Sequence, residues 1–160
     1  AANGGPIKRP SDGKEVKAVA FVQNVGQNST QEDQLPYHSG IGDLIAIKQA
    51  MYFKELNGDC DTTILFNDLR TPGAPGEDFY RAGQEKMITF SKGEVSEVVP
   101  GDSLQVKFKD LILDQDMEEE ADLVVLATGM VANSGVDIEE TPQNEPGEWE
   151  VSVESILNLN

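Results

Sequence analysis

Apolar segments of strand length alternate along this chain with segments whose apolar residues recur at helical spacing. Segments 17–23, 62–67 and 88–99 are predicted to be strands, and segments 43–56 and 77–87 are predicted to be helices. Strands that alternate with helices favour a parallel sheet joined by right-handed crossovers. The chain is therefore expected to adopt an α/β fold with a mostly parallel sheet.

A turn-forming segment, Pro100-Gly101-Asp102-Ser103, separates the extended segment 88–99 from a second one at 104–113. This pattern predicts an antiparallel hairpin that forms a small flap beside the parallel sheet. A last apolar segment, 123–127, would add another strand to that sheet. The combined layout is that of a Rossmann-like module, a fold used to bind mononucleotides and dinucleotides.

Composition indicates where the domain lies within the 160 residues, which suffice for one sizeable core. Residues 1–14 are rich in Gly, Pro and Lys and are expected to be a flexible linker of a processed protein or of a longer one. Residues 15–132 hold the predicted elements and are expected to form the Rossmann-like, nucleotide-binding-type module. Residues 133–160 are acidic and rich in Pro and Asn, which predicts a partly irregular tail.

The formal net charge of −17 argues against two classes of partner. Nucleic acids and anionic membrane surfaces both bind basic faces. No apolar run approaches the length of a transmembrane helix, so direct membrane insertion is not expected. The single cysteine, Cys60, allows no internal disulfide, which favours a cytoplasmic location. The acids beside Cys60 would raise the pKa of its thiol, so an inert thiol is expected.

The last predicted strand ends in Ala127-Thr128-Gly129, a turn of small residues. Gly129 can adopt backbone angles that are closed to other residues, and ligands of open α/β sheets lie at the carboxyl ends of strands. The turn is therefore a candidate cofactor-binding segment. An ordinary buried strand that ends at a glycine would have the same sequence, and both interpretations stay open.

A second candidate site, Gly40-x-Gly42, precedes the first predicted helix. Glycines at such a place let a pyrophosphate approach the backbone at a helix N-terminus. The third glycine position of the G-x-G-x-x-G fingerprint is Ile45, and the loop from the preceding strand is long, so the fingerprint is broken twice. Asp43 would also put a negative charge where the pyrophosphate arrives. A plain glycine entry to the helix is the alternative.

Three further residues are considered as site residues. Asp68 ends the second predicted strand and Arg70 follows it, where a ribose-binding acid would lie, although an ordinary turn is the alternative. His38 is the only histidine, and no catalytic triad or metal-ligand spacing surrounds it, so a loop histidine is expected. No catalytic residue and no metal site are predicted. The three glutamates at 118–120 are expected to form a solvated edge.

Seven short sequence motifs occur in the order in which the family described next has them. They are Arg9–Lys14 (RPSDGK), Val19–Gln23 (VAFVQ), Leu35-Pro36-Tyr37, Ile47–Ala50 (IKQA), Asp68-Leu69-Arg70, the predicted helix 77–85 with its Phe79-Tyr80, and Ala121–Met130. Across about residues 8–131 they resemble the flavin-binding A subunit of heterodisulfide reductases and its relatives in quinone-interacting membrane-bound oxidoreductase (Qmo) complexes. Because seven motifs occur in the same order as in that family, the resemblance is more specific than a match to any single glycine motif.

The resemblance implies a thioredoxin-reductase-like fold with two nucleotide-binding modules, FAD, and electron transfer between partner subunits. This chain would be the second module, equivalent to an NAD-binding domain, because the tight strand-GxGxxG-helix fingerprint of an FAD module is not in it. FAD of the parent protein would then be held mostly by a module outside this chain, with Ala127-Thr128-Gly129 facing it. Binding of NAD(P) stays open.

Members of the family with an iron–sulfur cluster in this module carry cysteines after Val-Gln and in a Tyr-Cys-Ser-Gly-x-Cys-Cys word. This chain has Asn24, His38, Gly42 and Asp43 at the matching positions. Cluster ligation needs thiolates. The resemblance therefore points to the cluster-free, Qmo-like branch and implies no iron–sulfur cluster.

The expected function is that of a piece of an FAD-dependent electron-transfer protein, which passes electrons between a sulfur-metabolism reductase and quinone. Other oxidoreductase subunits would be its partners, and membrane association would come only through them. The piece alone is not expected to be active. The alternative is a non-catalytic scaffold or docking module with a vestigial nucleotide site.

Overall fold

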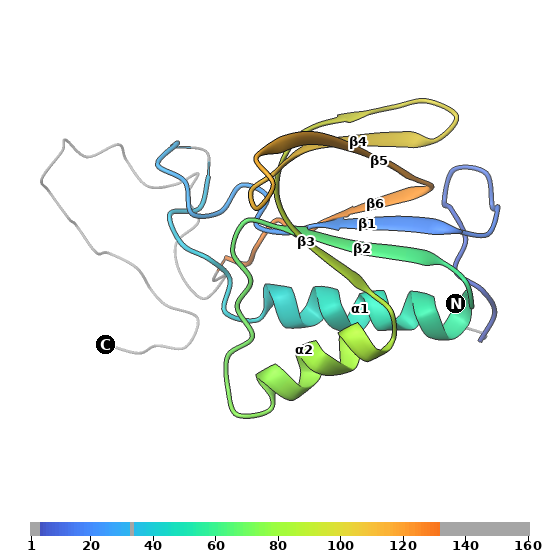
Figure 1. Cartoon of the computed structure of the whole chain (residues 1–160), viewed down its shortest axis with the longest axis horizontal. Helices are drawn as coiled ribbons and strands as arrows, with labels where there is room; N and C mark the ends of the chain where they lie inside the picture. Colours follow the sequence, from blue (N-terminus) through green and yellow to red (C-terminus); the bar gives the residue numbers. More distant parts are fainter. Residues whose placement is uncertain (1–3, 33, 132–160) are drawn as a thin grey trace, which may run out of the picture. The chain divides into compact units, whose positions relative to one another are not determined.

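The computed structural model describes residues 4–32 and 34–131. Six strands and two helices follow one another in this part of the chain (Figure 1). Every strand and helix predicted between residues 17 and 127 is present, and β5 is an additional strand. The bounds are β1 (Ala18–Val22), α1 (Gly42–Leu56), β2 (Asp61–Phe66), α2 (Gly76–Glu85), β3 (Thr89–Val99), β4 (Leu104–Asp110), β5 (Gln115–Ala121) and β6 (Leu123–Leu126).

The strands form one sheet in the order β5-β4-β3-β2-β1-β6. β6, β1, β2 and β3 run parallel, whereas β3, β4 and β5 pair in antiparallel fashion. The predicted α/β, Rossmann-like fold with a mostly parallel sheet and an antiparallel flap is therefore confirmed. The long strand β3 belongs to both parts, since Phe66 of β2 pairs with Lys92 and the next residue, Gly93, pairs with Asp110 of β4.

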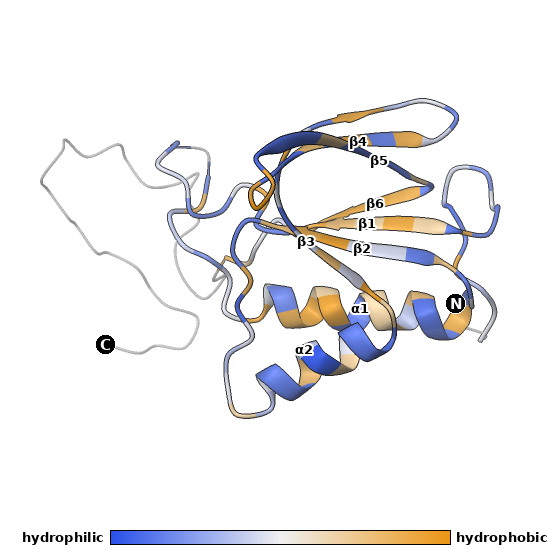
Figure 2. Cartoon of the chain, in the orientation of Figure 1, coloured by the Kyte–Doolittle hydropathy of each residue, from blue (hydrophilic) through white to orange (hydrophobic). Residues whose placement is uncertain are grey.

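The flap differs from the predicted hairpin because it contains a third strand, β5, at the edge of the sheet. The sequence of β5, QDMEEEA, is mostly acidic, and Figure 2 shows the strand as largely hydrophilic. An edge strand exposes one row of backbone groups to water, and charged side chains there discourage pairing with other chains. Such a strand lacks the apolar alternation that reveals strands in a sequence.

The helices α1 and α2 cover one face of the parallel strands (Figure 1). Val19, Phe21 and Ile64 alternate toward this face and belong to one buried cluster with Ile47 and Phe53 of α1. The rings of Phe21 and Phe53 meet edge to face, with centroids 5.9 Å apart. Burying each such side chain stabilises the fold by about 1.5–3 kcal/mol. This packing fixes β1, whose carboxyl end carries the candidate site.

The antiparallel strands contribute to the packing of the opposite face. Ala20 of β1 and Leu65 of β2 share a second buried cluster with Val106 and Phe108 of β4. Gly93 lies where β3 changes partners, and a Cβ atom there would be 2.7 Å from Cδ2 of Phe108. A residue without a side chain is therefore required for β4 to approach this closely.

Part of the predicted linker, residues 1–14, has specific contacts with the module. Asn57 accepts a hydrogen bond from the backbone N–H of Ile7 at 2.8 Å and donates to the carbonyl oxygens of Ile7 and Val16 at 2.9 Å each. These bonds tie a turn spanning residues 7–16 to the end of α1. Composition alone does not reveal them, because they depend on an asparagine far along the chain.

The domain boundaries predicted at residues 15 and 132 stay a prediction. The first compact unit of the fold spans Ala1–Gly129, and the predicted tail at 133–160 lies outside the described residues. Within the described part of the chain, neither helix has the length and apolar character needed to cross a bilayer.

Candidate functional site

The carboxyl ends of β1, β2 and β6 lie at one edge of the sheet, because these strands are parallel neighbours. The segments that follow them are the loop from Gln23 toward α1, residues 67–70, and the turn 127–129. Ligands of open α/β sheets bind at this edge. It therefore holds the candidate site, and nearly all residues predicted from the sequence lie along it.

The first turn of α1 is closed by groups of this chain. Ser39 Oγ accepts a hydrogen bond from the Gly42 N–H at 3.1 Å. The carboxylate of Asp43, a residue 1% exposed, accepts a hydrogen bond from the Arg70 N–H at 2.7 Å. Two of the predicted site residues, Gly42 and Arg70, therefore lie together at the start of α1, where Asp43 follows Gly42 and binds Arg70.

His38 occupies a loop, as expected, but the loop buries it. Its side chain is 1% exposed, and its Nε2 lies 2.9 Å from Asp43 Oδ2 and 3.0 Å from Asn24 Nδ2. Its Nδ1 lies 3.8 Å from Asp68 Oδ2. The expected loop histidine is therefore present, but it has partners that the sequence spacing does not reveal. Its partners come from the ends of β1 and β2 and from the start of α1, and only folding brings these segments together.

The buried carboxyl of Asp43 supplies an acidic group at the N-terminus of α1. Its burial raises its pKa, while the hydrogen bond from Arg70 and the neighbouring His38 oppose that rise. Helix N-termini attract anions through their free N–H groups and dipole. Because Asp43 lies in the first turn of α1, a pyrophosphate that approached this helix end would meet an acidic group of the protein.

Asp68, Arg70 and Gly40 lie at the solvent side of this network. Arg70 Nε donates to Asp68 Oδ2 at 2.7 Å, and both side chains are half exposed. A Cβ placed on Gly40 would have no neighbour within 4 Å, so this glycine is not required for close packing. The acid and the arginine remain accessible to a ligand, whereas Gly40 makes no contact that defines a site.

The turn Ala127-Thr128-Gly129 is covered by the loop that follows β1. The carbonyl oxygen of Ala127 accepts hydrogen bonds from the Val25 N–H and from Gln27 Nε2, each at 3.1 Å. Gly129 has a φ of +88°, and a Cβ there would lie 2.8 Å from side-chain carbons of Gln27 and Leu35. The glycine is thus needed for contacts within this chain, and only Thr128 of the three residues is exposed.

Gln27 is a central residue of this edge that the sequence patterns do not single out. It is 7% exposed. Its Oε1 accepts a hydrogen bond from the Ser39 N–H at 2.7 Å, while its Nε2 donates to Ala127. One side chain therefore joins the end of β6 to the start of α1. A glutamine in a polar loop gives no sequence signal of such a role.

Two other acidic or nucleophilic groups, one buried and one partly buried, lie away from this edge. Cys60 is 1% exposed, and burial is the main cause that raises the pKa of its thiol, in line with the inert thiol predicted. Glu119 accepts a hydrogen bond from Thr63 Oγ1, and burial raises the pKa of its carboxyl. The expected solvated run 118–120 is therefore corrected at its middle residue. Within residues 4–32 and 34–131, no group of three metal-binding side chains occurs.

Comparison with curated proteins shows which proteins this chain is related to. It is 34% identical over 139 residues to an iron-sulfur A subunit of the CoB–CoM heterodisulfide reductase of Methanopyrus kandleri, covering 84% of this chain and 21% of that protein. It is 38% identical over 129 residues to the A subunit of the ferredoxin/F420H2-dependent CoB–CoM heterodisulfide reductase of Methanosarcina acetivorans, covering 79% and 16%. The aligned segment belongs to the heterodisulfide reductase A family.

The relationship to heterodisulfide reductase A confirms the resemblance that the seven sequence motifs indicate. The chain spans only about a fifth of the length of these relatives. No family model matches the chain. Among solved structures, a thioredoxin reductase of T. acidophilum has a TM-score of 0.46 and 17% identity, over 74% of this chain and 33% of that one.

Proposed function

We propose that the chain is a module of an FAD-dependent electron-transfer protein of the heterodisulfide reductase A type. The observation that carries the proposal is sequence identity of 34–38% to such proteins over about four fifths of the chain. FAD is held mostly by a module outside this chain, and the exposed Thr128 and the Asp68–Arg70 pair face toward it. The partners are other oxidoreductase subunits.

The chain belongs to the Qmo-like branch, in which electrons pass between a sulfur-metabolism reductase and quinone. It acts in the cytoplasm and reaches the membrane through its partner subunits. The support is that Asn24, His38, Gly42 and Asp43 stand where family members with a cluster carry cysteines. Asn24 and Asp43 both contact His38, and Gly42 precedes Asp43 in the chain. These polar contacts at the replaced positions support a module without an iron–sulfur cluster.

Iron analysis tests the absence of the cluster. The purified chain should be colourless, contain no stoichiometric iron and stay colourless after anaerobic treatment with iron and sulfide. A variant with cysteine at positions 24, 38, 42 and 43 is the matched comparison, because it restores four thiolates in one place. Brown colour and bound iron in the unchanged chain would contradict the proposal.

A second candidate function is a non-catalytic scaffold or docking module with a vestigial nucleotide site. Two observations favour it: Asp43 fills the start of α1, and Gln27 and Leu35 cover Gly129. Calorimetric titration with FAD, NADH and NADPH tests whether this module has a cofactor site of its own. A saturable heat and a thermal shift with any of them contradict the vestigial site, whereas no heat and no shift restrict any cofactor role of this module to facing FAD that is held elsewhere.

A further inference from the structure

The turn that joins β4 to β5 presents three large aliphatic side chains to solvent. Leu111, Ile112 and Leu113 are 41%, 75% and 59% exposed. The other turn of the flap, at 100–103, has the sequence Pro-Gly-Asp-Ser, which is typical of turns. A run of three exposed aliphatic residues is a liability in a surface turn unless it serves a contact. We call residues 111–113 the apolar tip.

Hydrogen bonds hold the apolar tip in one conformation. Asp110 Oδ1 accepts hydrogen bonds from the N–H groups of Ile112 and Leu113 at 2.8 Å each. The Leu111 N–H donates to the carbonyl oxygen of Lys92 on β3 at 2.9 Å. The three N–H groups of the tip are therefore paired within the chain, and its side chains are left to form new contacts. A segment that is ordered beforehand loses less conformational entropy when it binds.

The apolar tip lies at the carboxyl end of the parallel strands. Lys92, whose carbonyl oxygen binds the tip, pairs with Phe66, the last residue of β2. Thr128 and the Asp68–Arg70 pair follow β6 and β2 at this same end. The tip and these candidate residues thus lie on one side of the chain, the side that the proposed function turns toward another module.

The strand that follows the apolar tip is acidic. Asp114 closes the turn, and its Oδ1 lies 2.6 Å from Lys109 Nζ. Asp116, Glu118 and Glu120 of β5 are exposed, and none of them has an ion pair among the described residues. Lys109 is therefore neutralised by its neighbour, whereas three carboxylates beside the tip are not.

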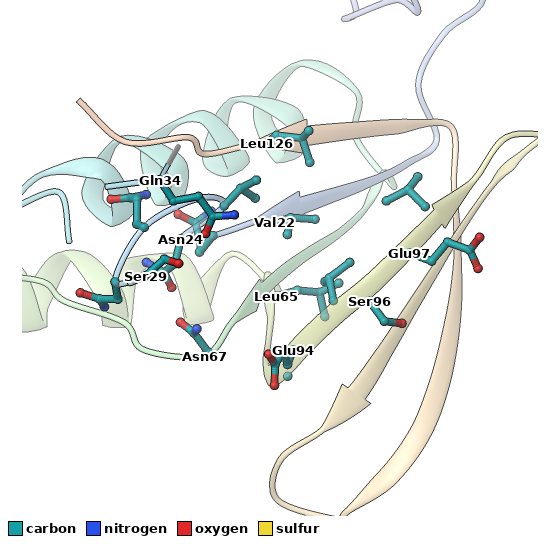
Figure 3. A pocket seen from close by; sticks show the side chains of 18 of the residues that line it. Val22, Asn24, Ser29, Gln34, Leu65, Asn67, Glu94, Ser96, Glu97 and Leu126 are labelled. Carbon is teal, nitrogen blue, oxygen red and sulfur yellow. The ribbon is translucent and has the colours of Figure 1, made fainter. Parts of the chain in front are cut away.

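Glu94 and Glu97 of β3 add to the negative charge of the flap. They line a cavity of about 590 Å³ that opens beside β3, and Figure 3 shows both side chains. Lys107 Nζ lies 3.1 Å from Glu97 Oε2, and Lys92 is exposed next to the tip. Carboxylates still outnumber cations around the apolar tip. Because contact surfaces are electrostatically complementary, the partner surface should be basic.

The charge of the flap and the length of the relatives favour one partner. An anionic membrane would be repelled by these carboxylates. A second copy of the chain would carry the same net charge of −17, which opposes self-association. The heterodisulfide reductase A relatives have about four fifths of their length outside the matched segment. A neighbouring module of one polypeptide is always present at high effective concentration.

We propose that the apolar tip docks this chain on another module of the same polypeptide. The tip inserts into an apolar pocket whose rim carries lysine and arginine side chains, and these face the carboxylates of β5. The inference rests on the proposed function only in that the chain is one module of a longer protein. It requires neither FAD, nor quinone, nor the absence of a cluster.

Photo-cross-linking in the full-length parent protein tests the inference. The photoreactive residue p-benzoylphenylalanine replaces Ile112 in one variant and Asp102, in the polar turn of the flap, in the matched control. Position 112 should cross-link within its own polypeptide, with a yield that does not change on dilution. Mass spectrometry should place the link in a segment where lysine or arginine neighbours aliphatic residues. Position 102 should give no such link.

A charge reversal tests the basic rim. With the photoreactive residue at position 112, Asp116→Lys should lower the yield of the cross-link about two- to fivefold, because a cation then faces the rim. The same charge change at the polar turn, Asp102→Lys, should leave the yield unchanged. An undiminished yield with Asp116→Lys would contradict a basic pocket.

A third variant separates docking from folding. In the 160-residue chain, Ile112→Asp should leave the melting temperature within about 2 °C of the unchanged value, because the side chain is 75% exposed. In the full-length protein, the same change should speed hydrogen exchange of the cross-linked segment about tenfold, because its pocket is uncovered.

Three further results would overturn the inference. The first is a cross-link from position 112 no stronger than that from position 102. The second is a cross-link to a separate subunit, to a second copy or to lipid. The third is unchanged hydrogen exchange in the full-length Ile112→Asp variant. Bound iron in the unchanged chain would contradict the proposed function and leave the cross-link pattern as it is, so the two failures are distinguishable.

Discussion

The two sides of the sheet's carboxyl edge differ in how their buried polar groups are satisfied. On the side of α1, Asp43, His38 and Gln27 bond to backbone and side-chain groups of this chain. On the side of β3, Gln23 lines a cavity with both polar atoms unpaired among the described residues. The buried polar groups of the first side are thus paired within the chain, whereas the amide of Gln23 on the second side is not paired among the described residues.

The difference bears on how a Rossmann-like fold is interpreted. The α1 side corresponds to the position where a dinucleotide would place its pyrophosphate, and an aspartate lies in the first turn of the helix here. The β3 side has no counterpart in the glycine fingerprint. A shared fold does not imply a shared ligand.

The largest expected effect compares two glutamines that are four residues apart. Gln27→Leu should lower the free energy of unfolding by about 2–4 kcal/mol, because the Ser39 N–H and the Ala127 carbonyl lose their partner while remaining buried. Gln23→Leu should leave it unchanged or raise it, since no hydrogen bond is lost. Urea unfolding followed by circular dichroism measures both.

Equal losses of stability in the two variants would break the comparison. Such a result would mean that Gln23 forms bonds within the folded chain that match those of Gln27. A larger loss for Gln23→Leu would mean that the cavity side, rather than the α1 side, is the one that the chain completes.

The next effect concerns Gly129 and Gly40, which are both candidate site residues. Gly129→Ala should destabilise the fold by about 1–3 kcal/mol, because its φ is +88° and the added Cβ would lie 2.8 Å from Gln27 and Leu35. Gly40→Ala should change stability by less than about 0.5 kcal/mol, because nothing lies within 4 Å of its Cβ position. Thermal and urea unfolding of both variants provide the measurement.

The two glycine variants also test whether the turn 127–129 has a cofactor role. If Gly129→Ala keeps its stability, the contacts with Gln27 and Leu35 are loose, and the turn is free to serve a cofactor as its sequence predicts. If it is destabilised as expected, the glycine is explained by its positive φ and its contacts within the chain, and a cofactor role must rest on Thr128.

The sequence patterns predict most of the fold because they report burial. Alternating or continuous apolar residues mark β1 and β2, which are mostly buried, and β6, whose first three residues are partly buried. β5 has no such pattern, since an acidic edge strand buries only Glu119 in part and Ala121 at its end. The pattern therefore fails where a strand is held by backbone pairing rather than by its side chains.

The site is predicted less well than the fold because its contacts are distant in sequence. Asp43 and Arg70 are 27 residues apart, and Gln27 and Ala127 are 100 residues apart. Glycines and strand-end acids mark the edge, but polar loop residues such as Gln27 and His38 acquire their roles only when the ends of β1, β2 and β6 meet. No local spacing rule describes that meeting.

The smallest expected effect tests the electrostatics of the closed side through pH. Burial raises the pKa of Asp43 above its ordinary 3.8, so the folded state binds the proton more tightly than the unfolded state. The stabilisation from this group is complete below pH 3.8 and is lost as the pH rises through the raised pKa. The unfolding free energy of the unchanged chain minus that of Asp43→Asn should therefore fall as the pH increases.

Asp12→Asn is the matched control with the opposite sign. Hydrogen bonds from Lys14 and Arg9 lower the pKa of Asp12 below 3.8, so its contribution is present above that pH and is lost on acidification. The difference for Asp12→Asn should rise with pH where that for Asp43→Asn falls. If both rise, the bonds from Arg70 and His38 outweigh burial, and the pKa of Asp43 lies below its ordinary value, so the closed side stabilises the negative charge of its carboxylate.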